Sequence, residues 1–252
     1  MKINNKIAIV TGGGTGVGRA TSLKLASKGC SVLVNYSRSN KEAEQTAREC
    51  QQLGVWAEPF QGDISNDEDC QAMVSTVEKK YGKLDILVNN AGNTVAVPHH
   101  NLGGISRDDW DRILGVNVIG TFQMTRAAEK ALKASGSGEV VMVSSIAGIK
   151  PSGSSIAYCA SKAAVNSLTQ TLAKVFAPQV RINAVCPGFI TGRWQQSMQG
   201  DRYEQTVESI VKATPLQKAA NPEDIADAIL SIIEGSDMMT GQCIMIEGGA
   251  FL

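Results

Sequence analysis

Short apolar runs rich in β-branched residues alternate with amphipathic patterns along almost the whole chain. The runs predict strands over residues 6–11, 31–36, 55–61, 84–89, 140–143 and 180–186, with a last short strand near the C-terminal end. The patterns between them predict helices over residues 19–29, 41–53, 67–81, about 107–132 and about 158–174, and one that starts at Asn221. Strands joined through helices form right-handed βαβ units. The alternation therefore predicts an α/β protein: a doubly wound parallel sheet, covered by helices on both faces, in three layers.

The domain organisation is expected to be simple. No Pro/Gly/Ser-rich linker divides the 252 residues and no repeat of solenoid period is present, so we expect a single domain. The segment 192–216 departs from the alternation because it is polar and weakly patterned, and we expect it to form a lid over a substrate. After it, Asn221-Pro222-Glu223-Asp224 predicts a helix start, with Asn as N-cap and Pro at the first helical position.

Composition excludes several classes of protein. Hydrophobic residues make up 43%, enough for a sizeable core, and the 24 basic and 24 acidic residues cancel, which gives no electrostatic case for binding nucleic acid or a membrane surface. No charged-then-apolar leader and no apolar run of bilayer length is present, so we expect a cytoplasmic protein. The six cysteines lack CxxC spacing and only two histidines are present, so we expect no metal site.

A glycine-rich stretch, TGGGTGVG, lies between the first predicted strand and helix, from Thr11 to Gly18. Glycines there permit positive φ and let a diphosphate approach free N–H groups at a helix N-terminus. The strict GxGxxG spacing is absent, and Arg19-Ala20 stand where a triphosphatase loop needs Lys-Ser/Thr, which argues against that class. A tight turn without a ligand is the alternative; the strand–turn–helix context favours a dinucleotide.

The end of the second predicted strand bears on the choice of dinucleotide. A carboxylate there would hold a ribose 2′-hydroxyl and select NAD(H), but Asn35 occupies the place, followed by Ser37 and Arg38. A neutral side chain does not repel a 2′-phosphate, and a guanidinium supplies its counter-charge. The sequence therefore favours NADP(H) over NAD(H), with Arg38 as an ordinary surface charge the alternative.

Three further side chains suggest acid–base chemistry. Tyr158 and Lys162 are four residues apart on a predicted helix and so lie on one face, and Ser145 follows the apolar strand before it. The alternative is a phenol that merely packs against a lysine stem. A free phenol has a pKa of roughly 10, and a nearby ammonium favours phenolate, so the pair suits proton transfer at a carbonyl or carbinol.

Six motifs occur in order: TGGGTGVG, the NNAG of residues 89–92, Asn117 within NVIG, Ser145, the YCASK of residues 158–162, and the PGFIT of residues 187–191. Over its whole length the chain resembles the short-chain dehydrogenase/reductase family, a group of Rossmann-fold oxidoreductases. It is most similar to the 3-oxoacyl-(acyl-carrier-protein) reductase branch, through the VNY at its second strand end and its NNAG.

The resemblance implies a role for each matched position. It implies a catalytic tetrad of Asn117, Ser145, Tyr158 and Lys162, with Ser145 preferred to Ser144 because Gly148 completes a Ser-x-x-Gly spacing. It implies that Gly12, Thr15, Gly16, Val17 and Gly18 form the diphosphate loop. Asp63 and Ile64 would flank the adenine, and Asn90 and Gly92 would border the ribose. Ile190 and Thr191 would hold the nicotinamide. Ser145 would donate to the substrate oxygen, and a kink at Asn117 would hold a relay water, unless Asn117 is simply exposed on a helix.

The implied activity is NADP(H)-dependent interconversion of a ketone and a secondary alcohol, as in a 3-oxoacyl-(acyl-carrier-protein) reductase-like carbonyl reductase. Two alternatives stay open: a dehydrogenase of a sugar, polyol, steroid or other small alcohol, and a non-catalytic NADP-binding sensor or structural subunit. His99 and His100, on the stretch 94–104, could touch a substrate or be bystanders. The resemblance also implies a homotetramer formed through the helices that carry Asn117 and Tyr158, together with the C-terminal segment.

Overall fold

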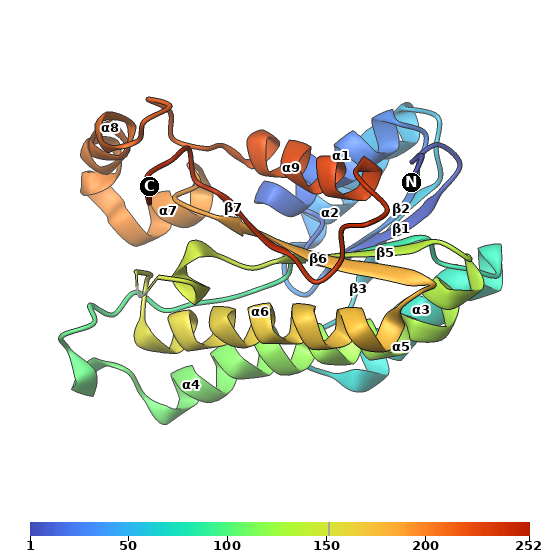
Figure 1. The fold of residues 1–252 in the computed structure, drawn as a ribbon, viewed down its shortest axis with the longest axis horizontal. Coiled ribbons are helices and arrows are strands. Elements are labelled where there is room, and N and C mark those ends of the chain that lie inside the picture. The colour runs from blue at the N-terminus through green and yellow to red at the C-terminus, as the bar shows by residue number, and fades with distance from the viewer. Residues whose placement is uncertain (151) are drawn as a thin grey trace.

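The computed structural model describes residues 1–150 and 152–252. Among these residues, seven parallel strands form one sheet in the order β3-β2-β1-β4-β5-β6-β7 (Figure 1). The strands are β1 Ile7–Val10, β2 Ser31–Tyr36, β3 Ala57–Gln61, β4 Ile86–Asn89, β5 Gly138–Val143, β6 Val180–Pro187 and β7 Cys243–Ile246. The prediction of a doubly wound parallel α/β sheet is confirmed.

The helices are α1 Gly16–Ser27, α2 Asn40–Gln52, α3 Asp67–Tyr81, α4 Arg107–Leu114, α5 Thr121–Ala134, α6 Ile156–Phe176, α7 Arg193–Gln199, α8 Tyr203–Ala213 and α9 Pro222–Glu234. The predicted helix over 107–132 is interrupted by a π-helix, Gly115–Gly120, between α4 and α5. The segment 192–216, predicted to be weakly patterned, contains α7 and α8. Neither helix has a fully buried residue, but α8 has a partly buried apolar stripe, Tyr203, Val207, Ile210 and Val211, at the spacing of a helix.

Successive side chains of a strand pack into two separate hydrophobic cores, one on each face of the sheet. In β1, Ile7 and Ile9 pack with α3, α5 and α6, whereas Ala8 and Val10 pack with α1, α2 and α9. Figure 1 shows these helix groups on opposite sides of the sheet. Because neighbouring side chains of a strand point to opposite faces, a strand buried on both faces must be apolar throughout, as the sequence shows.

The helix starts differ in their caps. At α9, Asn221 accepts from the backbone of Asp224 and the Asp224 carboxylate accepts from the backbone of Asn221, which confirms the predicted start. At α1, by contrast, Thr15 makes no side-chain cap and the first turn contains no acidic residue. The N-terminus of α1 therefore keeps its partial positive charge, and its first-turn N–H groups stay available as hydrogen-bond donors.

The carboxyl ends of the strands meet at one edge of the sheet, and the strand order changes direction between β1 and β4. Open α/β sheets bind ligands in the crevice outside such a point. The loops after β1 to β6 contain most of the predicted site residues, so this edge is the place to examine. Within the described residues, no helix combines the length and hydropathy needed to cross a bilayer.

Candidate functional site

Two asparagine side chains form hydrogen bonds with the backbone of the glycine loop. Asn35 is only 2% exposed; its Oδ1 accepts from the Gly12 N–H at 3.1 Å and its Nδ2 donates to the Gly62 carbonyl at 2.9 Å. Asn90 Nδ2 donates to the Thr11 and Gly12 carbonyls at 2.9 and 3.2 Å. Asn35, predicted to face the ribose, therefore shapes the loop instead, because its amide is already bonded to the backbone.

The glycines of this loop meet two different requirements. A Cβ added at Gly18 would lie 2.1 Å from the Gly12 carbonyl oxygen, so only glycine permits this approach of helix and loop. Gly16 has φ +51° and nothing within 4 Å of its Cβ position, so its surroundings are open. Together with the uncapped α1, Gly16, Val17 and Gly18 present backbone donors to open space, with Thr15 half-buried beside them. This is an arrangement that an anion can fill.

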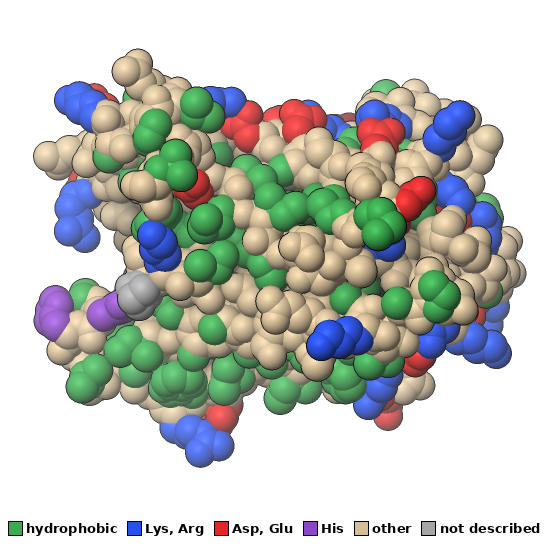
Figure 2. All heavy atoms as spheres, viewed as in Figure 1, with side chains coloured by type: hydrophobic (Ala, Val, Ile, Leu, Met, Phe, Trp, Pro, Cys, Tyr) green, Lys and Arg blue, Asp and Glu red, His purple; other side chains and the backbone are tan. Residues whose placement is uncertain are grey.

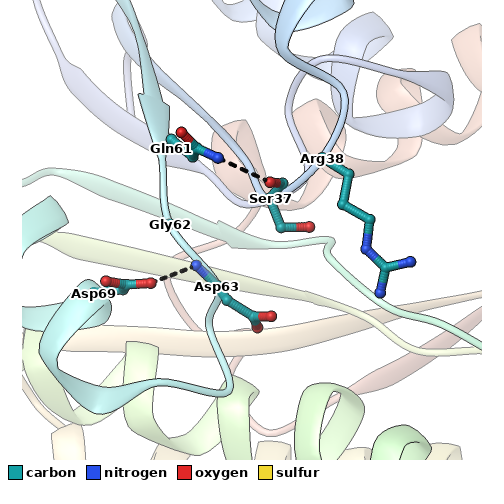
Figure 3. A pocket seen from close by; sticks show the side chains of 6 residues that line it. All are labelled: Ser37, Arg38, Gln61, Gly62, Asp63 and Asp69. Carbon is teal, nitrogen blue, oxygen red and sulfur yellow. Dashed lines mark hydrogen bonds between the residues drawn. The ribbon is translucent and has the colours of Figure 1, made fainter.

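A cavity of about 370 Å³ opens beside the loops after β2 and β3. Figure 3 shows its lining residues, Ser37, Arg38, Gln61, Gly62, Asp63 and Asp69. Arg38 is exposed, and no carboxylate among the described residues lies within 4.0 Å of its guanidinium. Two carboxylates share the cavity, and that of Asp69 accepts from the Asp63 N–H at 2.8 Å.

Ile64, predicted with Asp63 to flank an adenine, lies elsewhere. Its side chain is 3% exposed and belongs to the core formed with α3 and α5, where it packs against Gly120. The Asp63 side chain, by contrast, is exposed and lines the cavity.

Ser145, Tyr158 and Lys162 come together at the carboxyl end of β5. Ser145 Oγ donates to the Pro187 carbonyl at 3.5 Å and accepts from the Ala147 N–H at 3.1 Å, and Lys162 Nζ lies 5.6 Å from the centre of the Tyr158 ring. Burial raises the pKa of Tyr158 to about 12, and the nearby Ser145 hydroxyl partly opposes this rise. Burial lowers the pKa of Lys162 to about 8. Both shifts follow from the cost of placing charge in a poorly solvated site.

The Lys162 ammonium is held by one backbone hydrogen bond and lies close to Gly92. Its Nζ donates to the Val143 carbonyl at 2.8 Å, and a Cβ added at Gly92 would lie 3.8 Å from it. Gly92 thus leaves room beside the ammonium. The neighbouring Ser144 points into the protein, where its hydroxyl donates to the Lys162 carbonyl at 3.2 Å, whereas Ser145 lies close enough to Tyr158 to influence its pKa.

Asn117 lies within the π-helix, so the predicted irregularity of this helix is present. It is 1% exposed; its Oδ1 accepts from the Asn93 N–H at 2.8 Å, and its Nδ2 donates to the Asn93 carbonyl and to Ser161 Oγ, each at 3.0 Å. Ser161 Oγ in turn donates to the Tyr158 carbonyl at 2.7 Å. Asn117 therefore links the loop after β4 to the turn of α6 that presents Tyr158.

The sequence reasoning overlooked Ser161 and Asn93. The spacing of Tyr158 and Ser161, three residues apart on a helix, was the available signal, since it places a hydroxyl beside the turn that carries the phenol. No pattern in the sequence indicated that Asn93 would be the partner of Asn117.

The loop after β6 is tied to the segment before α9. Ile190 pairs with Ala220 as an isolated bridge, and the N–H and hydroxyl of Thr191 both donate to the Ala220 carbonyl, at 2.8 and 3.3 Å. Gly192, with φ +124°, then turns the chain into α7, and its N–H donates to the Tyr203 hydroxyl at 3.0 Å.

The opposite rim, residues 94–104, is attached to the loop before α6. The Val97 N–H donates to the Ser154 carbonyl at 2.8 Å, and His99 Nε2 lies 3.9 Å from Cys159 Sγ, next to Tyr158. Figure 2 shows the two histidines at the end of the molecule that also carries α7 and α8. His99 thus packs beside the site, whereas His100 is exposed.

Comparison with known proteins identifies the family. The short chain dehydrogenase model matches residues 6–202. The chain belongs to the short-chain dehydrogenase family. It is 42% identical to ketoacyl reductase 2 of the granaticin polyketide synthase of Streptomyces violaceoruber, over 98% of this chain and 96% of that protein.

Two further relatives span nearly their whole lengths. The 3-oxoacyl-(acyl-carrier-protein) reductase FabG of Thermotoga maritima is 32% identical over 99% of both chains. The solved structure of xylitol dehydrogenase with bound NAD⁺ matches with a TM-score of 0.90 at 29% identity, over 99% of this chain and 100% of that one. As a short-chain dehydrogenase, the protein is an oxidoreductase of ketoacyl reductase-like sequence, in a family that uses NAD(P)(H).

Proposed function

We propose that the protein is an NADP(H)-dependent carbonyl reductase that converts the ketone of a 3-oxoacyl thioester into a secondary alcohol. The observation that carries the proposal is the convergence of Ser145, Tyr158 and Lys162 beside the glycine loop, on one edge of the sheet. The two ketoacyl reductase relatives support the substrate class.

The loop of α1 fits a dinucleotide diphosphate, because its first-turn donors are uncapped and Gly16 faces open space. We propose that Gly12, Thr15, Gly16, Val17 and Gly18 form this cradle and that Asn90 supports it, while Gly92 borders the ribose, Asp63 the adenine, and Ile190 and Thr191 the nicotinamide. When bound, the reduced nicotinamide supplies hydride to the carbonyl carbon.

The chain's own groups would handle the oxygen and the proton. Ser145 Oγ donates to the substrate oxygen as charge develops there, and Tyr158 gives that oxygen its phenolic proton. The phenolate left on Tyr158 is stabilised by the ammonium of Lys162, which the Val143 carbonyl holds in place. Asn117 and Ser161 keep the Tyr158 turn in position.

The proposed preference for NADP(H) depends on Arg38. Its guanidinium lines the cavity, has no carboxylate of the described residues within 4.0 Å, and can neutralise a 2′-phosphate, whereas Asp63 and Asp69 in the same cavity disfavour one. A polyol dehydrogenase that uses NAD(H) is the second candidate, supported by those two carboxylates and by the xylitol dehydrogenase neighbour.

A substrate panel separates the two candidates. The purified protein is given a 3-oxoacyl thioester, a simple activated ketone and, with oxidised dinucleotide, a polyol, each with NADP(H) and NAD(H) side by side. We expect the thioester and NADPH to be preferred. Polyol oxidation with NAD⁺ alone would support the second candidate, and dinucleotide binding without any turnover would indicate a sensor.

Charge removal tests the role of Arg38. Arg38→Gln should lower the NADPH-over-NADH ratio of kcat/KM about tenfold or more, because a charge-assisted contact to phosphate is lost. Arg48→Gln is the matched control, since the partners of Arg48, Glu44 and Gln45, lie on its own helix. An unchanged ratio in Arg38→Gln would contradict the proposed preference.

We also propose a homotetramer and a lid over residues 192–216. Ile119 of the π-helix and Phe122 of the first turn of α5 are 53% and 37% exposed, and Met245 of β7 is 42% exposed. This is apolar surface that subunit contacts would cover. Light scattering at a monomer mass would contradict the tetramer.

A further inference from the structure

An ion pair joins the first residue of α7 to the first turn of α2. Arg193 Nη1 lies 2.9 Å from Glu42 Oε1, and the side chains are 66% and 44% exposed. The two residues are 151 positions apart in the chain. The hydrogen bond from Arg193 helps to lower the pKa of the Glu42 carboxyl, together with a larger backbone contribution.

The pair spans the crevice at the carboxyl edge of the sheet. Helix α2 follows β2 and α7 follows β6, and β1, β4 and β5 lie between those strands. The contact between α2 and α7 therefore joins elements that start on either side of the strand ends presenting the glycine loop, Gly92 and Ser145.

The Glu42 end of the pair adjoins the glycine loop. A Cβ added at Gly14 would lie 2.8 Å from Cα of Ala43, so the first turn of α2 packs directly on the loop. At the other end, Arg193 is two residues beyond Thr191, the last residue proposed to border the nicotinamide. The ion pair thus joins the two sides of the crevice in which the dinucleotide is proposed to lie.

Among the described residues, the other hydrogen bonds that tie down the two ends of the segment 192–216 do not cross this crevice. The Gly192 N–H bonds to Tyr203 within the segment, and the Leu216 N–H donates to the Gly248 carbonyl at 3.1 Å at its far end. The segment is therefore anchored at its far end through Leu216, and the contact that holds its beginning across the crevice is the Arg193–Glu42 ion pair.

The geometry points to Arg193 and Glu42 as the pair that closes the dinucleotide crevice and limits the rate at which the dinucleotide leaves. This inference rests on the proposed function, because it takes the crevice to be the dinucleotide site. The pair acts by holding α7 against α2, so neither residue needs to touch the dinucleotide itself.

The size and salt dependence of the effect follow from exposure. Exposed ion pairs contribute little, so losing this one should speed release about two- to fivefold. Dissolved salt screens such pairs, so release from the unaltered protein should also speed up as salt is raised.

The test is the release rate of NADPH, followed by the fluorescence of the bound dinucleotide in a rapid-mixing experiment without carbonyl substrate. Arg193→Gln and Glu42→Gln should each raise the rate about two- to fivefold and should respond less to salt. The doubly exchanged variant, Arg193→Glu with Glu42→Arg, should return toward the original rate. Glu234→Gln, which breaks the similarly exposed Lys28–Glu234 pair between α1 and α9, is the control and should change nothing.

Three results would overturn the inference. The first is equal release rates in all variants. The second is weaker binding in Arg193→Gln together with tighter binding in Glu42→Gln, which would make Arg193 a direct phosphate contact. The third is a double exchange no better than the single variants. Failure of the unaltered protein to bind any dinucleotide would instead refute the proposed function, so the two failures are distinguishable.

Discussion

Around the glycine loop, polar side chains form hydrogen bonds with the backbone. Helices α7 and α8, by contrast, have no buried residue and contact the rest of the protein through few hydrogen bonds and ion pairs. Asn35, Asn90 and Asn117 belong to the first region, and Tyr203 and Arg193 to the second. The difference teaches that the groups proposed for chemistry are held by many polar contacts, while the segment proposed as a lid is held by few. Weakly held elements open at low free-energy cost, as a lid must.

The largest effect should come from the first region. Tyr158→Phe removes the proton donor and should lower turnover by a factor on the order of 10²–10⁴, while NADPH affinity stays nearly unchanged. Steady-state rates and dinucleotide fluorescence measure the two quantities. Tyr81→Phe, at the end of α3, is the control. Turnover that survives the Tyr158 substitution would refute the acid–base assignment.

A second substitution tests the close packing of the glycine loop against α1. Gly18→Ala places a Cβ 2.1 Å from the Gly12 oxygen, an overpacking that costs roughly 1–3 kcal/mol and should weaken NADPH binding roughly 5- to 150-fold. Gly103→Ala, where a Cβ meets nothing within 4 Å, should bind as before. Fluorescence titration measures NADPH affinity and thermal unfolding measures stability. Equal NADPH affinity in both variants would show that the loop shifts to accommodate the added methyl group.

The pH dependence probes burial in the first region. Lys162 is the group that titrates nearest the working range, since burial lowers its pKa to about 8 and raises that of Tyr158 to about 12. Above the lowered pKa the ammonium is lost, so kcat/KM for reduction should be level near neutral pH and fall about tenfold per unit beyond about pH 8. NADPH affinity over the same range is the control. A break near the ordinary lysine pKa would mean that the site is better solvated than its burial indicates.

Ser161→Ala tests whether positioning depends on the link from Asn117. Loss of the hydroxyl frees the Tyr158 turn, and we expect kcat to fall about tenfold while KM and NADPH affinity change little, because misplacement acts on the reacting geometry. Ser167→Ala, on an exposed position of the same helix, is the comparison. A change in KM alone would indicate a role in substrate binding instead.

The smallest effect should come from the weakly held region. Tyr203→Phe removes the hydroxyl that accepts from the Gly192 N–H, a net contribution of about 1 kcal/mol, and should raise KM for the carbonyl a few-fold with little change in kcat. Substrate-saturation curves measure it. An effect as large as that of Tyr158→Phe would erase the contrast between the two regions.

The alternation of apolar runs and amphipathic patterns was enough to predict the parallel sheet, its strands to within a few residues and the capped start of α9. These features depend on local pattern: a strand buried on both faces must be apolar, and a cap is set by its own few residues. The helices of the segment 192–216 were not predicted. The apolar spacing of Tyr203, Val207, Ile210 and Val211 in α8 was an available signal that was overlooked, whereas α7 has only seven residues and buries none of them.

Pairing between distant residues was decided by the tertiary structure alone. The sequence placed Asn35 at the ribose and Ile64 at the adenine, but the fold bonds Asn35 to the loop and buries Ile64, because each strand end turns its side chains according to the pleat. Likewise, the link from Asn117 to Ser161 and the pair of Arg193 with Glu42 join segments whose approach no local pattern encodes. Residue types and spacing determined which chemistry is available to this protein, and the packing of distant segments decided which side chains are free to perform it.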